Sequence, residues 1–309
     1  MYSGVVRPDG TPHPADTREL LKQAAADAEK TGLRFMFGAQ QTFYLLCLDS
    51  EGNPTKIPYD NAGYLDIAPG DRGENIRREI CLTLEQMGIR PESSHHEEGP
   101  GQNKIDFRFS SALEAADNAM TFQTVVRTAA HRNGLYADFS PKPLDNCPGN
   151  GCHINFSVQP LQPDISVENS LRSAAAGILS KIAPMTAFLD PTEDSYRRLG
   201  ARVGGTGIRW SGKDRTRILW MPSAGGTTGK AELRSPDPGT NPYLAFALLI
   251  RAGLCGLTEK AALPPENGEE AAGWLPGTLE EARRTASDSG FIRDCLPGVV
   301  RAAYGVSAE

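Results

Sequence analysis

Apolar and polar positions follow one another in blocks that predict both helices and strands. Apolar residues three and four positions apart, with capping or terminating residues at the ends, favour helices over 16–31, 74–87, 112–132, 166–188, 241–255, 279–287 and 291–296. Aromatic-rich and alternating runs favour strands over 33–48, 151–158 and 231–234. Residues 91–109 predict a hairpin, and the glycine-rich stretch 200–207 predicts a mobile loop. The elements follow no regular βαβ rhythm, so the pattern predicts an α+β fold.

The composition of the 309-residue chain indicates an ordinary globular protein. Hydrophobic residues make up 39% and charged residues 23%, and the net charge of −6 disfavours binding to nucleic acid or acidic membranes. The sequence has neither a signal-peptide core nor the roughly 18 consecutive apolar residues of a membrane span. Its six cysteines are scattered, which predicts reduced thiols rather than a zinc site. We therefore expect a cytoplasmic protein.

Polar residues occupy one face of the predicted strand 151–158. His153, Asn155 and Ser157 alternate with the apolar side chains of Cys152, Ile154, Phe156 and Val158. This alternation fits either a half-exposed strand with its polar face in water or a strand that lines a cleft.

The predicted hairpin concentrates charged and histidine side chains beside its turn. His95-His96-Glu97 precedes Gly99-Pro100-Gly101, and Gln102-Asn103-Lys104 follows it. Antiparallel pairing is expected to bring Glu97 close to Lys104, since cross-strand neighbours lie about 5 Å apart. The cluster fits either a simple ion pair or a metal site.

Four motifs in chain order carry a resemblance to a known family. HHEEGPGQNKIDFRF, SPKP with PGNGCHINFSV, DSYRRL and ELRSPDPGTNPYLAFA together resemble the catalytic domain of glutamine synthetase and its γ-glutamyl-amide ligase relatives. The resemblance implies one catalytic domain over 1–309, in which a curved antiparallel sheet lines the active-site cleft and helices pack outside. Residues 1–7 alone precede the matching part, so the family's N-terminal β-grasp domain is expected to be absent.

The resemblance implies two metal sites. The family's reaction uses ATP to phosphorylate the glutamate side chain, an amine then displaces phosphate, and two Mg²⁺ or Mn²⁺ ions hold the phosphates. The corresponding positions here are Thr42, Glu97 and Lys104 for the first ion, and Gln40, His153 and Glu232 for the second. An ammonium group repels a cation and an amide is a weak ligand, so the first site is expected to be lost and the second weakened. Lys104 is expected to form an ion pair with Glu97.

Other positions are implied in the same way. The substrate positions are Gly149, Arg198, Arg215 and Arg234, and the nucleotide positions are Glu92, Ser157 and Lys230. Trp220 stands where the family usually has an arginine. Gly204 aligns with the mobile-loop glutamate, and a glycine performs no acid–base chemistry.

These departures predict a degenerate, catalytically impaired homologue that acts as a binding or regulatory protein. The alternative is an active ATP-dependent ligase that joins glutamate to ammonia or to another amine. Glutamate and ATP are the expected small-molecule ligands. Because the β-grasp domain is expected to be absent, self-association or association with a full-length glutamine synthetase is expected.

Overall fold

A ten-stranded sheet runs through the computed structural model, which describes all residues except 1, 202–204, 225–226, 267, 269–270 and 308–309. Its order is β3-β4-β1-β7-β12-β9-β8, and β2, β5 and β6 also pair with the long strand β1. The strands are β1 Leu33–Leu48, β2 Pro54–Pro58, β3 Pro91–His96, β4 Gln102–Phe107, β5 Ser110–Ser111, β6 Leu135–Asp138, β7 Cys152–Pro160, β8 Trp210–Ser211, β9 Leu219–Trp220 and β12 Ala231–Leu233. A separate pair comprises β10 Ser223–Ala224 and β11 Thr227–Thr228. Strands β8 and β9 are parallel and the other pairs are antiparallel.

The helices begin at the capping residues that the sequence indicates. Asp16 accepts hydrogen bonds from the first turn of α1, and Asn241 does the same for α6, whose first residue is Pro242. The helices are α1 Thr17–Lys30, α2 Glu74–Gln86, α3 Ala112–Arg132, α4 Val167–Leu189, α5 Glu193–Gly200, α6 Pro242–Thr258, α7 Leu279–Ser287, α8 Gly290–Cys295 and α9 Gly298–Ala303. The sequence pattern did not predict α5, α9 or most of the short strands.

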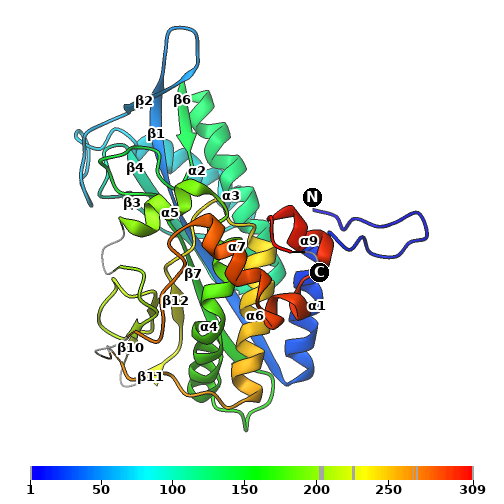
Figure 1. Ribbon diagram of the computed structural model, residues 1–309. Coiled ribbons are helices and arrows are strands. Elements are labelled where there is room, and N and C mark those ends of the chain that lie inside the picture. The colour runs from blue at the N-terminus through cyan, green and yellow to red at the C-terminus, as the bar shows by residue number, and fades with distance from the viewer. Residues whose placement is uncertain (1, 202–204, 225–226, 267, 269–270, 308–309) are drawn as a thin grey trace.

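The sheet has a packed face and an open face. Phe37 of β1 and Phe156 of β7 are fully buried, and the Phe37 ring stacks on Phe246 of α6 at 4.4 Å. Figure 1 shows α1, α4 and α6 alongside β1 and β7. On the opposite face of β7, His153 and Ser157 are only partly covered. The predicted alternation of β7 and the predicted α+β class, with a mostly antiparallel sheet, are both confirmed.

Helices α4 and α6 approach closely because glycines face each other between them. A Cβ at Gly177 of α4 would lie 2.2 Å from the Ala252 carbonyl oxygen, so no larger residue fits there without displacement of α6.

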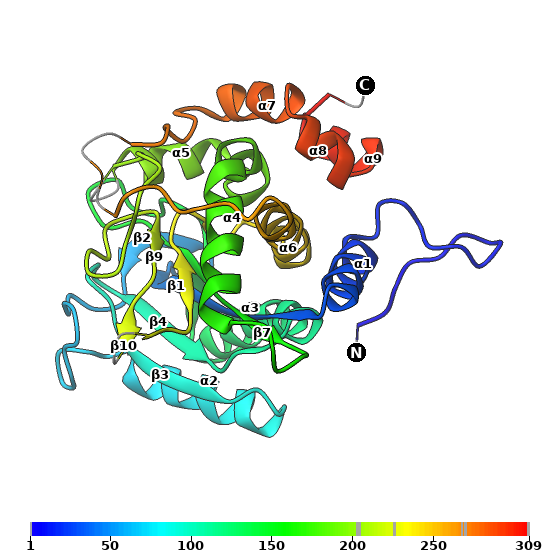
Figure 2. The ribbon, with the colours of Figure 1, turned by 90° about the horizontal axis from the view of Figure 1, so that it is seen from below.

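Figure 2 shows α2 with β3 and β4 on one side of the molecule and α7, α8 and α9 on the other. No helix within the described ranges is long and apolar enough to cross a membrane.

Candidate functional site

A cavity of about 540 Å³ opens where the hairpin turn, the loop before β7 and α5 meet. It brings together six positions that the sequence predicts for ligand binding: Glu97, Gly149, His153, Arg198, Arg215 and Arg234. Thr42, Glu98, Gln102 and Lys142 also line it. Cationic side chains outnumber carboxylates among the described lining residues, which favours an anionic ligand.

A second cavity, of about 570 Å³, lies between α1, α6 and α8. Its two arginines are engaged by the protein itself: Arg251 pairs with Asp27 at 2.7 Å, and Arg293 donates to the Ser287 carbonyl at 2.8 Å. The smaller cavity is therefore the candidate site, because it gathers the predicted residues.

Two uncharged side chains of β1 stand on the open face of the sheet. Gln40 is opposite His153 of β7, and Thr42 is opposite Lys104 of β4. Gln41 faces the other way, where it is buried and accepts a hydrogen bond from α3 at 2.7 Å. Gln40 and Thr42 thus occupy the positions that the resemblance assigns to metal-binding glutamates.

Glu232 lies at the centre of a buried charge cluster on β12. Its Oε1 atom is 3.2 Å from His153 Nδ1, which makes no well-aligned hydrogen bond, and it also accepts from Arg234. Burial alone would raise the pKa of Glu232, but His153, Arg234 and Lys104 lower it to about 2. Burial and the Arg234 charge lower the pKa of His153 to about 4. At neutral pH the carboxylate is therefore ionised and the imidazole is neutral.

The hairpin forms as predicted, but its register differs from the expected one. Strand pairing places Lys104 opposite His95, and the Glu97 N–H donates to the Gln102 carbonyl. The predicted ion pair between Lys104 and Glu97 is wrong: Lys104 Nζ lies 3.8 Å from Asp106 Oδ1, and His95 Nε2 lies 3.3 Å from Glu97 Oε1.

The positive charge of Lys104 nevertheless acts electrostatically on Glu97. Burial alone would raise the pKa of Glu97, but the His95 contact and the Lys104 charge lower it. Burial raises the pKa of Asp106, although Lys104 opposes this shift. The side chain of Lys104 is only 12% exposed, so its ammonium is an internal cation of the site.

The two implied metal positions differ in their fit. At the first, one carboxylate stands with the Thr42 hydroxyl and the Lys104 ammonium, a donor set that does not suit a divalent cation. At the second, the imidazole of His153 and the carboxylate of Glu232 are suitable ligands, but Arg234 already occupies that carboxylate. The described side chains therefore fit a divalent cation poorly at the first position, and at the second Arg234 stands against the ligand carboxylate.

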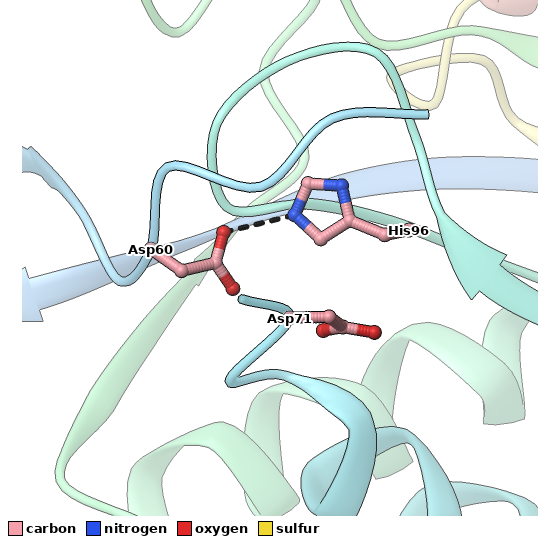
Figure 3. Close-up of side chains that lie close together, drawn as sticks. All are labelled: Asp60, Asp71 and His96. Carbon is pink, nitrogen blue, oxygen red and sulfur yellow. Dashed lines mark hydrogen bonds and ion pairs between the residues drawn. The ribbon is translucent and has the colours of Figure 1, made fainter. Parts of the chain in front are cut away.

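A different group of three side chains has its ligand atoms close together. Among the described residues, Asp60, Asp71 and His96 hold such atoms within 4.8 Å of one another, and all three are buried (Figure 3). His96 Nε2 is 2.9 Å from Asp60 Oδ1, and His96 Nδ1 is 2.7 Å from the Glu97 carbonyl oxygen. Both partners are acceptors, so both ring nitrogens carry protons. Burial alone would lower the pKa of His96, but these contacts raise it.

The remaining atoms of this group are also satisfied. Arg77 bonds Asp71 through two nitrogens, at 3.0 and 2.5 Å, and its Nη1 also donates to Asn103 at 2.6 Å. Backbone N–H groups of Arg72 and Gly101 donate to Asp60. The group is therefore an ion network that fastens the hairpin to the preceding loop, rather than a metal centre. The sequence pattern does not reveal this network, because its members are far apart along the chain and follow no motif spacing.

Arg198 packs against Gly149 at the wall of the cavity. A Cβ at Gly149 would lie 2.5 Å from Arg198 Cγ and 2.6 Å from the Pro141 carbonyl oxygen. Gly149 therefore provides space for the stem of Arg198, which is a structural reason for a glycine at a predicted substrate position.

A Gly149→Ala substitution is expected to lower the free energy of unfolding by about 1–3 kcal/mol, because the added methyl group meets backbone on one side. Urea denaturation measures the loss. Gly200→Ala is the control, since a Cβ at Gly200 meets nothing within 4 Å. Equal stability of the two variants would contradict the close packing of Arg198.

The other predicted residues are placed in varied surroundings. Arg215 stacks over Trp220 at 4.3 Å. Glu92, Ser157 and Lys230 do not line the cavity; Glu92 and Lys230 are exposed, and Ser157 is partly buried on β7. Gly204 lies outside the described residues.

A family model, two relatives and two solved structures each match this chain over nearly its whole length. The family model "Glutamine synthetase, catalytic domain" matches residues 14–305. The chain is 42% identical to a glutamine synthetase of Clostridium saccharobutylicum, covering 100% of this chain and 75% of the relative, and 39% identical to one of Methanosarcina mazei, covering 100% and 74%. The solved structure of apo GmaS without ligand is 28% identical with a TM-score of 0.85, covering 96% of this chain and 72% of that one. Plasmodium falciparum glutamine synthetase shares the fold, with a TM-score of 0.84 at 20% identity, covering 97% and 77%.

Proposed function

Because the chain belongs to the glutamine synthetase family, we propose that it is a catalytically silent member that binds an acidic amino acid such as glutamate. It then acts as a binding or regulatory protein. The observation that carries the proposal is the internal cation Lys104, which stands among Glu97, Asp106 and Glu232 and favours the ionised form of each. One ammonium group thus supplies positive charge where the family uses a metal ion.

The proposed loss of activity follows from the charge neutralisation and the open coordination positions that metal ions supply in the family's reaction. In the family's reaction, divalent ions neutralise the phosphates and the charge that develops in the transition state. The ammonium of Lys104 balances charge in the resting site, but it offers no open coordination position for a phosphate oxygen. Thr42 adds a hydroxyl that donates towards Gly151 and accepts its N–H at 2.8 Å, so it too is occupied.

The cationic wall of the cavity supports an acidic ligand. Arg198 and Arg234 present guanidinium groups, whose planar donors match a carboxylate, and Lys142 and Arg215 add charge near them. Binding of a dicarboxylic amino acid therefore does not require a metal.

The proposal is tested by calorimetric titration of wild type and Lys104→Glu with Mg²⁺ and with glutamate. Wild type is expected to bind glutamate equally well with Mg²⁺ or with a chelator. Lys104→Glu is expected to bind Mg²⁺ roughly tenfold or more tightly than wild type, because it removes a repelling charge and adds a carboxylate. The gain remains partial, since Thr42 still lacks a carboxylate.

Lys104→Met is the matched control, because it removes the ammonium without adding a ligand. A gain in Mg²⁺ affinity in Lys104→Glu that exceeds the gain in Lys104→Met identifies the first metal position. Wild type that binds Mg²⁺ as tightly as Lys104→Glu would contradict the proposal.

The second candidate function is an ATP-dependent glutamate–ammonia or γ-glutamyl-amine ligase that acts through a γ-glutamyl phosphate. The observation that favours it is the 42% identity, across the whole chain, to a protein named glutamine synthetase. In that case ATP would be expected near Glu92, Ser157 and Lys230, and one Mg²⁺ or Mn²⁺ ion would be held by Gln40, His153 and Glu232. A turnover assay separates the two functions.

A further inference from the structure

Two carboxyl groups lie behind Arg198, on the side away from solvent. Asp190 ends α4 and Asp237 follows β12, and both are fully buried. Arg198 Nη2 donates to Asp190 Oδ1 at 2.9 Å and also to the Ser235 carbonyl. The Gly239 N–H donates to Asp237 Oδ1 at 2.7 Å. The guanidinium group that lines the cavity is therefore anchored from behind.

The charges of this cluster do not balance if both carboxyl groups are ionised. The Oδ2 atoms of Asp190 and Asp237 are both buried without a well-aligned donor, and the two residues adjoin, since the Asp237 N–H donates to the carbonyl of Leu189, next to Asp190, at 3.4 Å. The two carboxyl groups also act on each other's pKa. One guanidinium group faces two carboxyl groups, and two ionised carboxylates cannot bond each other. A single proton between them supplies a donor for both carboxyl groups and makes the cluster neutral. The Ser195 hydroxyl also interacts with Asp237, but it is uncharged and does not change this balance.

The groups around the cluster supply no second positive charge in contact with it. Cys152 and Tyr196 face it, and burial raises the pKa of each, so both are neutral. The next charged groups are Glu193, exposed at the start of α5, and Arg283 of α7, which acts on Tyr196 and donates to the Tyr304 carbonyl. Neither makes a hydrogen bond to Asp190 or Asp237 among the contacts described.

We propose that Asp190 and Asp237 share one proton and act as a positioning pair that holds Arg198 in the cavity at constant charge, ready for the carboxylate of the ligand. The role in ligand binding rests on the proposed function, whereas the shared proton does not. Burial and the neighbouring Asp237 raise the pKa of Asp190 well above its ordinary value, against the pull of Arg198. Burial likewise raises the pKa of Asp237.

The shared proton makes ligand affinity depend on pH in a defined direction. With one proton present, Arg198 and the pair together carry no net charge. As the pH rises the pair loses that proton, the cluster becomes negative, and it repels an incoming carboxylate. Asp190→Asn and Asp237→Asn each keep one carboxylate for Arg198 and have no shared proton to lose. Both variants are therefore expected to fold and to bind the ligand without this dependence.

The first test requires no ligand. Infrared difference spectra at neutral pH, wild type minus Asp190→Asn and wild type minus Asp237→Asn, are each expected to contain the carbonyl band of one protonated carboxylic acid. Both substitutions remove the band because the remaining carboxyl group ionises beside Arg198. Asp49→Asn is the control, since Asp49 is exposed, its pKa is lowered by the Asn53 N–H, and it contributes no such band. The absence of the band from both difference spectra would overturn the shared proton.

The second test measures glutamate affinity by calorimetry from neutral pH up to the pH at which the infrared band of the protonated carboxylic acid disappears from wild type. Wild-type affinity is expected to fall roughly tenfold towards the alkaline end, whereas Asp190→Asn affinity stays constant. A merely structural role would leave the two profiles parallel, and parallel profiles overturn the positioning role. If no variant binds glutamate, the proposed function and the positioning role both fail, and the infrared result still decides the shared proton.

Discussion

Purified protein supplied with glutamate, ATP, Mg²⁺ and ammonium is expected to form glutamine at a rate roughly a thousandfold or more below that of an active family member. The expectation rests on the first metal position, where Thr42 and Lys104 stand at positions that the family resemblance assigns to carboxylates and where Glu97 is the remaining carboxylate. A lost ion that stabilises the transferring phosphate costs several kcal/mol of transition-state stabilisation, and each 1.4 kcal/mol corresponds to about tenfold in rate. A coupled phosphate-release assay and direct detection of glutamine measure the rate.

The control for this assay is the Clostridium saccharobutylicum relative, measured in parallel under the same conditions. A rate within tenfold of that relative, roughly 1.4 kcal/mol in barrier height, would overturn the silent-homologue proposal and favour the ligase. A triple variant, with Gln40→Glu, Thr42→Glu and Lys104→Glu, places a carboxylate at each of the three positions that the resemblance assigns to one. It is expected to gain Mg²⁺ affinity beyond Lys104→Glu alone.

The sequence pattern predicted those helices and strands whose form depends on residues close together in the chain. The alternation of β7 places Cys152 and Ile154 in the core and His153 on the open face, because side chains of a strand alternate between its two faces. The caps of α1 and α6 were readable for the same reason, since Asp16 and Asn241 act on the turn that follows them.

Contacts between distant segments were not predictable in this way. The hairpin was expected, but its register depends on the Glu97 N–H bond to Gln102 across the turn, which places Lys104 opposite His95 instead of Glu97. The proton-sharing pair is a second contact between distant segments, and it has even less signal in the sequence. Asp190 and Asp237 meet only because α4 and the segment after β12 pack together, and neither residue belongs to a periodic pattern. The family resemblance therefore identified residues of the cavity wall but not the residues behind it.

An Arg77→Met variant is expected to lose about 3–5 kcal/mol of unfolding free energy, because it leaves the buried carboxylate of Asp71 without its counter-charge. The side chain of Arg77 is 5% exposed and that of Asp71 is 1% exposed, so water does not compensate for the loss. Arg77 also donates to Asn103 and, at 3.2 Å, to Ser94, and both acceptors lose their donor. Urea denaturation with a circular dichroism readout measures the change.

Two further variants separate the charge effect from packing. Arg77→Met combined with Asp71→Asn is expected to recover part of the loss, since the amide removes the uncompensated charge and still accepts the Gly73 N–H. Arg108→Met breaks an exposed pair with Glu92 and is expected to cost at most about 1 kcal/mol. An Arg77→Met loss as small as that of Arg108→Met would contradict the network. His96 of the same network also contacts the Glu97 carbonyl oxygen at 2.7 Å, so the ion network supports the backbone beside one wall of the candidate site.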